Sequence, residues 1–289
     1  MTAKIIDQGV KLRCITRRIV RMCAPQISAI PIFENNYVWV IRPDPSQPDV
    51  YLVDPGEVVP VISFLTKHQL LPKAILVTHR HRDHIEGIKE ITHHWPIPVY
   101  GPDSAAIPQV THPLIEGDVL RLDDLAFHIM AVPGHTNEHI AFFLPASAQC
   151  TPRAAPLVFC GDALFAGGCG RMFDGPADLM WNSLCKLAAL PDNTLIYCTH
   201  EYTLANLEFA VAVEPDNTAI HERLKQTRVL REEARITLPS NILMEKRTNP
   251  FLRCHLDGVK NFVCPEGVNN YSPAQVFALL RALKDNWAS

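Results

Sequence analysis

The sequence lacks a long apolar run and has no excess of charge of one sign. No apolar run approaches the ~18–20 residues that a helix needs to cross a bilayer, so we expect no membrane association. Lys and Arg number 27 and Asp and Glu number 30, which gives a net charge of −3. Nucleic-acid-binding proteins are usually basic, so we expect no nucleic-acid partner. The 47% hydrophobic and 20% charged residues exclude collagen, coiled coil and wholesale disorder.

The sequence also lacks the cysteine pattern of a disulfide framework. Its nine cysteines are an odd number and include no C-x-x-C pair, which predicts a reducing compartment, the cytoplasm. Residues 1–24 lack the apolar core of a secretory signal and hold six basic residues and one acid. They are either a basic targeting or disordered arm, or the product of an upstream start codon with Met22 as the natural first residue. We favour the second explanation.

Short apolar runs and turn residues alternate between residue 27 and about residue 199, and helical spacing appears between some of the runs. Strands interleaved with helices indicate an α/β or α+β domain. The predicted strands are Tyr37–Ile41, Val50–Val53, Ala74–Thr78, Pro98–Tyr100, Ala126–Val132, His139–Leu144, Leu157–Cys160 and Thr194–Cys198. The predicted helices are Val59–His68, His84–His94 and Asp178–Leu190.

After His200 the pattern changes to helices with no convincing strand between them. The predicted helices are Leu204–Val213, Thr218–Ile236 and Pro273–Asp285. We therefore predict a basic extension (1–24), an α/β or α+β domain (25–200) and a helical domain (201–289). These regions carry net charges of +5, −8 and 0.

The strongest chemical signal is the segment THRHRDH (78–84), which follows a predicted strand. In an extended segment His79 and His81 point the same way, and Asp83 and His84 come from the entry to the next helix. Four such side chains within six residues can bind two metal ions side by side. Imidazole and carboxylate ligands suit zinc, iron or manganese.

Three further candidate ligands, His135, Asp162 and His200, each follow a predicted strand. Taken singly, each would more often be an ordinary turn or cap residue. Beside the H-x-H-x-D-H motif, we interpret the three as further metal ligands, because loops commonly carry binding residues. Asp54 also ends a strand, and it is either a turn residue or a hydrogen-bond acceptor for a ligand histidine.

These residues resemble the metallo-β-lactamase superfamily, and longer motifs resemble one family within it, glyoxalase II or hydroxyacylglutathione hydrolase. The similar segments are IPIFENNYVWV (30–40), THRHRDH (78–84), VPGHTNEH (132–139), FCGDALFAGGCGRMFDG (159–175), YCTHEYTLAN (197–206) and NPFLR (249–253). The resemblance runs from about residue 27 to the C-terminus. It implies an α+β fold: a four-layer αββα sandwich followed by a small helical domain.

The resemblance also implies which residues bind two divalent metal ions. One ion is expected on His79, His81 and His135, the other on Asp83, His84 and His200, with Asp162 bridging both. Asp83 and Asp162 would then help to hold the nucleophilic hydroxide. Zinc is the metal we expect, and iron and manganese are compatible with these ligands.

The implied reaction is hydrolysis of S-D-lactoylglutathione, and of related 2-hydroxyacyl-glutathione thioesters, to D-lactate and glutathione. This is the second step of methylglyoxal detoxification. Metal binding lowers the pKa of water from ~16 toward ~7, which makes a bridging hydroxide available at neutral pH. This hydroxide attacks the carbonyl, so no side-chain nucleophile is needed, and the thiol of the product leaves as thiolate without a strong general acid. The expected partner is therefore a small-molecule glutathione thioester, and we expect a monomer.

The family positions that hold glutathione are matched by Arg171, Tyr202, Arg281 and Lys284. Arg281 and Lys284 lie three residues apart on a predicted helix and so share a face. Phe173 stands where some members have a tyrosine that hydrogen-bonds the substrate. We expect that contact to be lost and binding to weaken modestly.

Several rival functions are disfavoured. A persulfide dioxygenase of the same superfamily would need one iron on His79, His135 and Asp162, but the ligands of a second metal and the helical tail are also present. The GCGR segment and the Arg281/Lys284 pair disfavour a lactonase or a β-lactamase-like hydrolase. The acidic region 25–200 disfavours a nuclease, and the complete ligand set disfavours a non-catalytic binding protein.

Overall fold

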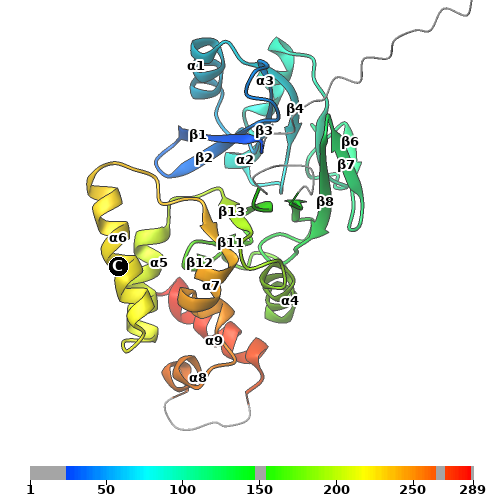
Figure 1. Cartoon of the computed structure of the whole chain (residues 1–289). Helices are drawn as coiled ribbons and strands as arrows, with labels where there is room; N and C mark the ends of the chain where they lie inside the picture. The colour runs from blue at the N-terminus through cyan, green and yellow to red at the C-terminus, as the bar shows by residue number, and fades with distance from the viewer. Residues whose placement is uncertain (1–23, 147–153, 265–270, 288–289) are drawn as a thin grey trace, which may run out of the picture.

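The computed structural model describes residues 24–146, 154–264 and 271–287 (Figure 1). The predicted extension, apart from Ala24, lies outside the described residues. The six described cysteines are all free, as expected from the lack of a disulfide pattern. No described helix is long and apolar enough to cross a membrane.

Fourteen strands and nine α-helices form the described chain. The strands are β1 (Gln26–Ile32), β2 (Asn36–Arg42), β3 (Asp49–Val53), β4 (Leu71–Leu76), β5 (Val99–Pro102), β6 (His112–Leu114), β7 (Val119–Leu122), β8 (Leu125–Ala131), β9 (Ile140–Leu144), β10 (Leu157–Gly161), β11 (Leu164–Phe165), β12 (Gly168–Cys169), β13 (Leu195–Cys198) and β14 (Ser240–Asn241). The helices are α1 (Val58–His68), α2 (Arg82–Ile85), α3 (Ile88–His94), α4 (Ala177–Ala188), α5 (Thr203–Val213), α6 (Thr218–Glu232), α7 (Ile242–Thr248), α8 (Asp257–Val263) and α9 (Pro273–Asp285), with a 3₁₀ turn at Pro250–Leu252.

Two six-stranded mixed sheets lie face to face. The first has the order β1-β2-β3-β4-β5-β6, and the second has the order β14-β13-β10-β9-β8-β7. In the first sheet, β1 to β3 are antiparallel and β3 to β6 are parallel. In the second sheet only β10 and β13 are parallel.

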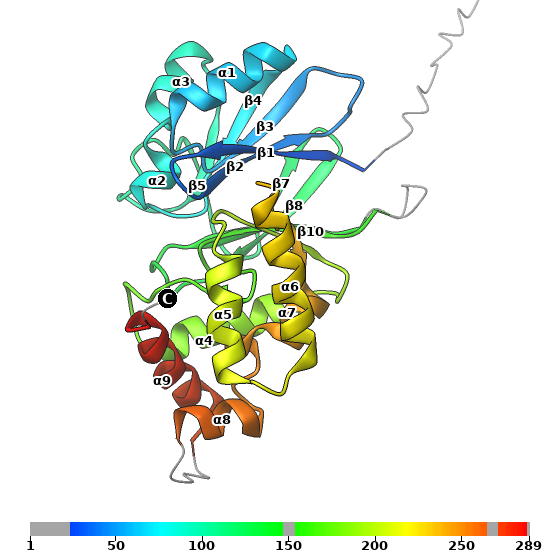
Figure 2. The same cartoon turned by 90° about the vertical axis from the view of Figure 1, so that its left-hand side faces the viewer.

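The side chains of β2 show how the layers are built. Tyr37, Trp39 and Ile41 point into the core between the two sheets, whereas Val38 and Val40 belong to the core on the other face. Both faces are buried because α1 and α3 cover the outer face of the first sheet, and α4 packs onto the core of the second (Figure 2). This arrangement confirms the predicted αββα sandwich followed by a helical domain.

The tail is mostly helical, as predicted, but it also contributes a strand. The two residues of β14 pair antiparallel with β13 and extend the second sheet. The expectation of no strand after His200 is therefore wrong, because so short a strand is set by its partner and leaves no pattern in the sequence. The tail is anchored to the sandwich through α9, whose Phe277 shares the central core with Met180 of α4.

The predicted helix His84–His94 is divided into α2 and α3 at Gly87. The Gly87 N–H donates to the Pro55 carbonyl oxygen at 3.1 Å. A Cβ at this position would lie 2.5 Å from the same oxygen. A contact distant in sequence therefore breaks a helix that the local pattern predicts to be continuous.

Candidate metal centre

Seven His and Asp side chains converge at one edge of the sandwich, from loops and from a single short helix. His79 follows β4, and His81 is the N-cap residue of α2. Asp83 and His84 lie in α2, where an acidic residue in the first turn is favoured by the helix dipole. The others, His135, Asp162 and His200, follow β8, β10 and β13. All seven predicted ligands are thus brought together.

The first group consists of His79, His81 and His135. The Nδ1 atom of His81 lies 3.1 Å from His79 Nε2 and 2.9 Å from His135 Nε2. Asp162 Oδ2 lies 3.5 Å from His135 Nε2. Ligand atoms of these three histidines and Asp162 all lie within 4.8 Å of one another.

The second group consists of Asp83, His84 and His200. Asp83 Oδ2 lies 3.5 Å from His84 Nε2 and 3.4 Å from His200 Nε2. Asp162 faces this group too, with Oδ1 3.4 Å from His84 Nε2 and Oδ2 3.2 Å from His200 Nε2. Asp162 therefore lies between the two groups, where a bridging ligand would be placed.

The donor set fits two divalent ions. Ligands about 2.0–2.1 Å from a tetrahedral zinc are on the order of 3.3 Å from one another, close to the spacings in both groups. His84 Nε2 and Asp162 Oδ1 are buried and have no hydrogen-bond partner within the described structure. A buried polar atom without a partner is costly, and a metal ion would provide one for each.

The outer nitrogens of three of these histidines are held by acceptors. The Nδ1–H of His135 donates to the Arg171 carbonyl oxygen at 2.8 Å. The Nδ1–H of His200 donates to Asn35 Oδ1 at 3.0 Å, and the Nδ1–H of His84 donates to Asp54 Oδ2 at 3.0 Å. Such bonds fix the tautomer and leave the Nε2 lone pair free for a metal.

Asp54 fulfils both alternatives considered from the sequence. It has a positive φ of 52° in its turn, and its carboxylate binds His84. The same carboxylate accepts from the Thr78 backbone N–H at 2.8 Å and from the Thr78 hydroxyl at 2.7 Å. Asp54, His79 and His84 also lie close enough to form a metal-binding group. Because donors already surround the Asp54 carboxylate, we interpret Asp54 as an acceptor that orients His84.

His139 and Arg80 are among the residues that hold the site and were not singled out from the sequence. His139 is buried, stacks on His79 with 4.5 Å between ring centroids, and accepts the Asp162 N–H at 3.2 Å. Arg80 binds Glu138 at 2.5 Å and Asp174 at 2.7 Å, which ties the H-x-H segment to two other loops. The sequence does carry a signal for Arg80. Side chains alternate in direction along an extended segment, so Arg80 points away from His79 and His81 and toward other parts of the chain. His139 carries no such signal.

Glycine is required immediately before Asp162. Gly161 has a φ of +48°, and a Cβ there would lie 2.3 Å from the Thr78 hydroxyl oxygen. Only a residue without a side chain permits this turn and this close approach. The turn sends the Asp162 carboxylate between the two groups.

Burial keeps the first group neutral. It lowers the pKa of His79 well below its usual value, and it also lowers the pKa of His81 and His135 despite the attraction of Asp162. A neutral imidazole has the lone pair that a metal needs.

The second group is more polar. Burial lowers the pKa of His84, but the carboxylates of Asp162 and Asp54 outweigh it and raise that pKa well above its usual value. Burial also lowers the pKa of His200, but the charge of Asp162 and the hydrogen bonds to Asp162 and Asp83 outweigh it and raise that pKa. Burial would raise the pKa of Asp83, but His200, His84 and Asn36 hold it well below its usual value.

A cavity of about 650 Å³ opens onto these ligands. It is lined by residues from both the sandwich and the tail, and it contains all five predicted substrate-binding residues: Arg171, Phe173, Tyr202, Arg281 and Lys284. Phe173 is exposed and lies edge-on to the rings of His81 and His135. Tyr202 stacks on His200 with 4.6 Å between centroids. Aromatic rings thus flank the ligands on two sides.

The two basic residues of α9 are held by the protein in different ways. Arg281 is buried, donates to the Cys169 carbonyl at 3.0 Å and lies 3.0 Å from Asp285, and its Nε has no partner in the described part of the chain. Lys284 donates to the Ala205 carbonyl at 3.1 Å. Burial and the neighbouring Arg281 lower the pKa of Lys284 to about 8.

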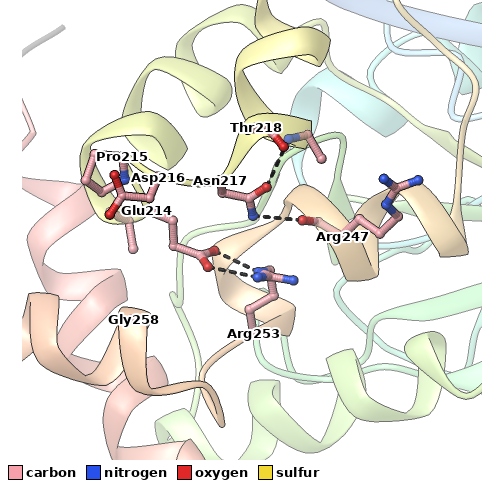
Figure 3. Close-up of a pocket in the computed structure, with 10 residues that line it drawn as sticks. Glu214, Pro215, Asp216, Asn217, Thr218, Arg247, Arg253 and Gly258 are labelled. Atoms are coloured by element: carbon pink, nitrogen blue, oxygen red, sulfur yellow. Dashed lines mark hydrogen bonds and ion pairs between the residues drawn. The ribbon is translucent and has the colours of Figure 1, made fainter.

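A second cavity, of about 640 Å³, lies in the tail beside the start of α6 (Figure 3). Its Arg253 binds Glu214 through both Nε and Nη2, at 2.7 and 2.8 Å. Asn217 caps α6 and donates to the Arg247 carbonyl oxygen. The charges of Arg253 and Glu214 are therefore paired, and the groups of described residues that could hold a metal ion all lie at the other cavity, which also has buried polar atoms without partners.

The fold and the site together define a protein of the metallo-β-lactamase superfamily. Residues 32–200 match the family model of the Metallo-beta-lactamase superfamily. Residues 201–287 match the model described as Hydroxyacylglutathione hydrolase C-terminus. The chain also has the fold of ETHE1 from Myxococcus xanthus, with a TM-score of 0.58 and 24% identity, covering 90% of this chain and 98% of that one.

Within the superfamily, the chain belongs to the hydroxyacylglutathione hydrolase family. It is 46% identical over 264 residues to the hydroxyacylglutathione hydrolase of Pseudomonas aeruginosa, covering 91% of this chain and 99% of the relative. It is 47% identical over 259 residues to that of Chromohalobacter salexigens, covering 89% and 98%. The resemblance found in the sequence motifs is thereby confirmed.

Proposed function

We propose that the protein hydrolyses S-D-lactoylglutathione and related 2-hydroxyacyl-glutathione thioesters to the 2-hydroxy acid and glutathione. The observation that carries the proposal is one cavity lined by five of the seven candidate metal ligands, with the cations of α9 in its wall and the other two ligands buried behind them. The chain is a member of a thioester hydrolase family, and its curated relatives are named hydroxyacylglutathione hydrolase.

The two ligand groups support two divalent metal ions. Zinc is the proposed metal, and a similarly folded solved structure, TTHA1623, is described as di-iron-bound. When bound, the ions would supply a water of lowered pKa and a Lewis acid for the thioester carbonyl. His79, His81 and His135 would hold one ion and Asp83, His84 and His200 the other, with Asp162 shared between them.

The remaining side chains bind and orient the substrate. Glutathione carries carboxylates, and Arg171, Arg281 and Lys284 place positive charge in the wall of the cavity. Tyr202 and Phe173 present aromatic surface beside the ligands. Phe173 has no hydroxyl, so it cannot donate a hydrogen bond to the substrate.

Several finer features belong to the same proposal. The family-model matches, which meet at residue 200, support a division into a catalytic domain and a substrate-binding domain at that point. We also propose that the protein is a cytoplasmic monomer that does not bind nucleic acid or membranes. Free described cysteines and the near-neutral charge support this environment.

The direct test is loss of thioester absorbance when zinc-loaded protein is mixed with S-D-lactoylglutathione. Absence of turnover by metal-replete protein would contradict the proposed reaction. Elemental analysis is expected to give about two metal ions per chain, since there are two ligand groups. A value near one, unchanged by added zinc, would contradict the two-metal site.

A further inference from the structure

The turn between β1 and β2 reaches the second ligand group from a distant part of the sequence. Phe33 takes a positive φ of 49° in this turn, and its N–H donates to the Glu57 carboxylate at 3.0 Å. The Tyr37 N–H donates to the Thr199 carbonyl at 2.7 Å, and the Glu201 N–H donates to the Asn35 carbonyl at 2.8 Å. The turn is thus fixed against the segment that carries His200.

Asn36 holds Asp83. The Asn36 side chain is buried, and its Nδ2 donates to Asp83 Oδ2 at 2.9 Å. A carboxylate can only accept, so the amide nitrogen must face it. The same nitrogen lies 3.4 Å from His200 Nε2, which places it beside two of the second group's ligand atoms.

Asn35 holds His200 with the opposite polarity. Its Oδ1 lies 3.0 Å from His200 Nδ1. For Nε2 to bind a metal, Nδ1 must carry the proton, and the amide oxygen must accept it. One asparagine is therefore needed as a donor and its neighbour as an acceptor.

The first group is held by other parts of the chain. The outer nitrogen of His135 is bound by Arg171, and the H-x-H segment is tied down by Arg80 through Glu138. Within the described residues, the recorded hydrogen bonds of Asn35 and Asn36 to metal ligands reach only Asp83 and His200. The two groups thus have separate supports.

The geometry points to Asn35 and Asn36 as positioning residues that set metal affinity at the second group alone. The inference rests on the two-metal site of the proposed function, and it adds which residues hold the ligands of the second group in place. The Asp83 carboxylate and the His200 ring can rotate when their partners are removed, whereas His79, His81 and His135 keep theirs. Loss of such a partner typically weakens metal binding by about 10–100-fold.

The test measures zinc dissociation constants by chelator competition in two backgrounds. His135→Ala weakens the first group and His200→Ala weakens the second. Asn36→Leu, which keeps the volume but removes the donor, is expected to raise the zinc dissociation constant about 10–100-fold in the His135→Ala background. In the His200→Ala background it should change the constant by less than about threefold.

Asn35 provides the test of polarity. Asn35→Leu should act like Asn36→Leu, because the acceptor for His200 is lost. Asn35→Asp keeps an acceptor and should retain the affinity of the unsubstituted chain. If Asn35 acted only in folding, Asn35→Leu and Asn35→Asp would not differ in zinc affinity in this way. The matched control is Asn137→Leu, an exposed asparagine two residues from His135 whose side chain holds no ligand in the described structure; it should leave both constants unchanged.

Each result decides the inference. If the unsubstituted protein binds two zinc ions and Asn36→Leu leaves both constants unchanged, the inference is wrong and the two-metal site stands. If Asn36→Leu weakens both groups equally, the effect is not selective and the inference is also wrong. If the single-ligand backgrounds bind no zinc, the same variants in the unsubstituted chain must weaken one constant and spare the other. A single zinc in the unsubstituted protein would contradict the two-metal site itself.

Discussion

The sandwich and the helical tail contribute different kinds of side chain to the same cavity. The sandwich carries all seven candidate metal ligands, five of which line the cavity, and most of them are buried and held by hydrogen bonds from other loops. The tail contributes Tyr202 and the two cations of α9, which lie in the cavity wall. The part that holds the candidate metal ligands is fixed by buried contacts, whereas the part that we propose to bind the remote end of the substrate is one face of α9.

This difference predicts two kinds of variant. Changes in the sandwich should remove metal and lower kcat, because they affect the reacting centre. Changes in the tail should raise KM with the metal content intact. They remove contacts that bind the substrate and the transition state equally, so kcat is unchanged. A tail variant that lost metal, or a ligand variant that changed only KM, would break the comparison.

The largest effect is expected for Asp162→Ala. Asp162 faces both ligand groups, so the variant should retain neither metal ion and lose at least ~10³-fold in kcat/KM, about 4 kcal/mol. Elemental analysis and steady-state kinetics check this outcome. Retention of about two metals per chain would show that Asp162 is not the shared ligand.

Next comes Arg80→Met, which removes the ion pairs to Glu138 and Asp174. The H-x-H segment should loosen, and zinc affinity should fall about 10-fold or more, as for other partners of ligands. Arg82→Met is the matched control, because Arg82 is exposed and pairs with Glu86 on the surface, where an ion pair contributes little. Equal losses in the two variants would argue against a role for the Arg80 ion pairs.

For the tail, Arg281→Met should raise KM about 10-fold, since a hydrogen bond to a charged group contributes about 1.5–3 kcal/mol. The metal content should stay at that of the unsubstituted protein. Arg281 is buried, so the melting temperature must be measured alongside the kinetics. Arg228→Met, an exposed tail variant paired with Glu208, should leave KM unchanged.

The tail should also give KM a pH dependence. The pKa of Lys284 is lowered to about 8, so the side chain is charged below that pH and neutral above it. KM should therefore rise as the pH increases through 8, roughly threefold, because a partly exposed ion pair contributes up to about 1 kcal/mol. Lys284→Arg stays protonated and should flatten the profile; an unchanged profile would assign the titration to another group.

The smallest effect is expected for Phe173→Tyr, which tests the boundary between the two regions. Phe173 is exposed at the mouth of the cavity and lies edge-on to two ligand rings. An added hydroxyl can donate one hydrogen bond to the substrate and should lower KM about twofold to fivefold, about 0.5–1 kcal/mol. A large change in kcat would place Phe173 with the metal centre rather than with the binding surface.

The sequence predicted the strands and helices with strong patterns and missed those that depend on partners. β2, β3, β8, β9 and β10 were all anticipated from apolar runs. β1 was missed; it contains Pro31, which a strand at the edge of a sheet tolerates. α7 and α8 have only seven residues each, so their periodicity is too short to detect.

The sequence by itself determined the chemistry, because ligand identity is local: the H-x-H-x-D-H motif and three residues that follow strands name all seven candidate ligands. Only the tertiary structure decided how they are held. Asp54, Asn35, Asn36 and His139 contact their partners across 23 to 165 residues of chain. Such contacts follow from sheet order and loop packing, and no spacing rule within a segment of sequence encodes them.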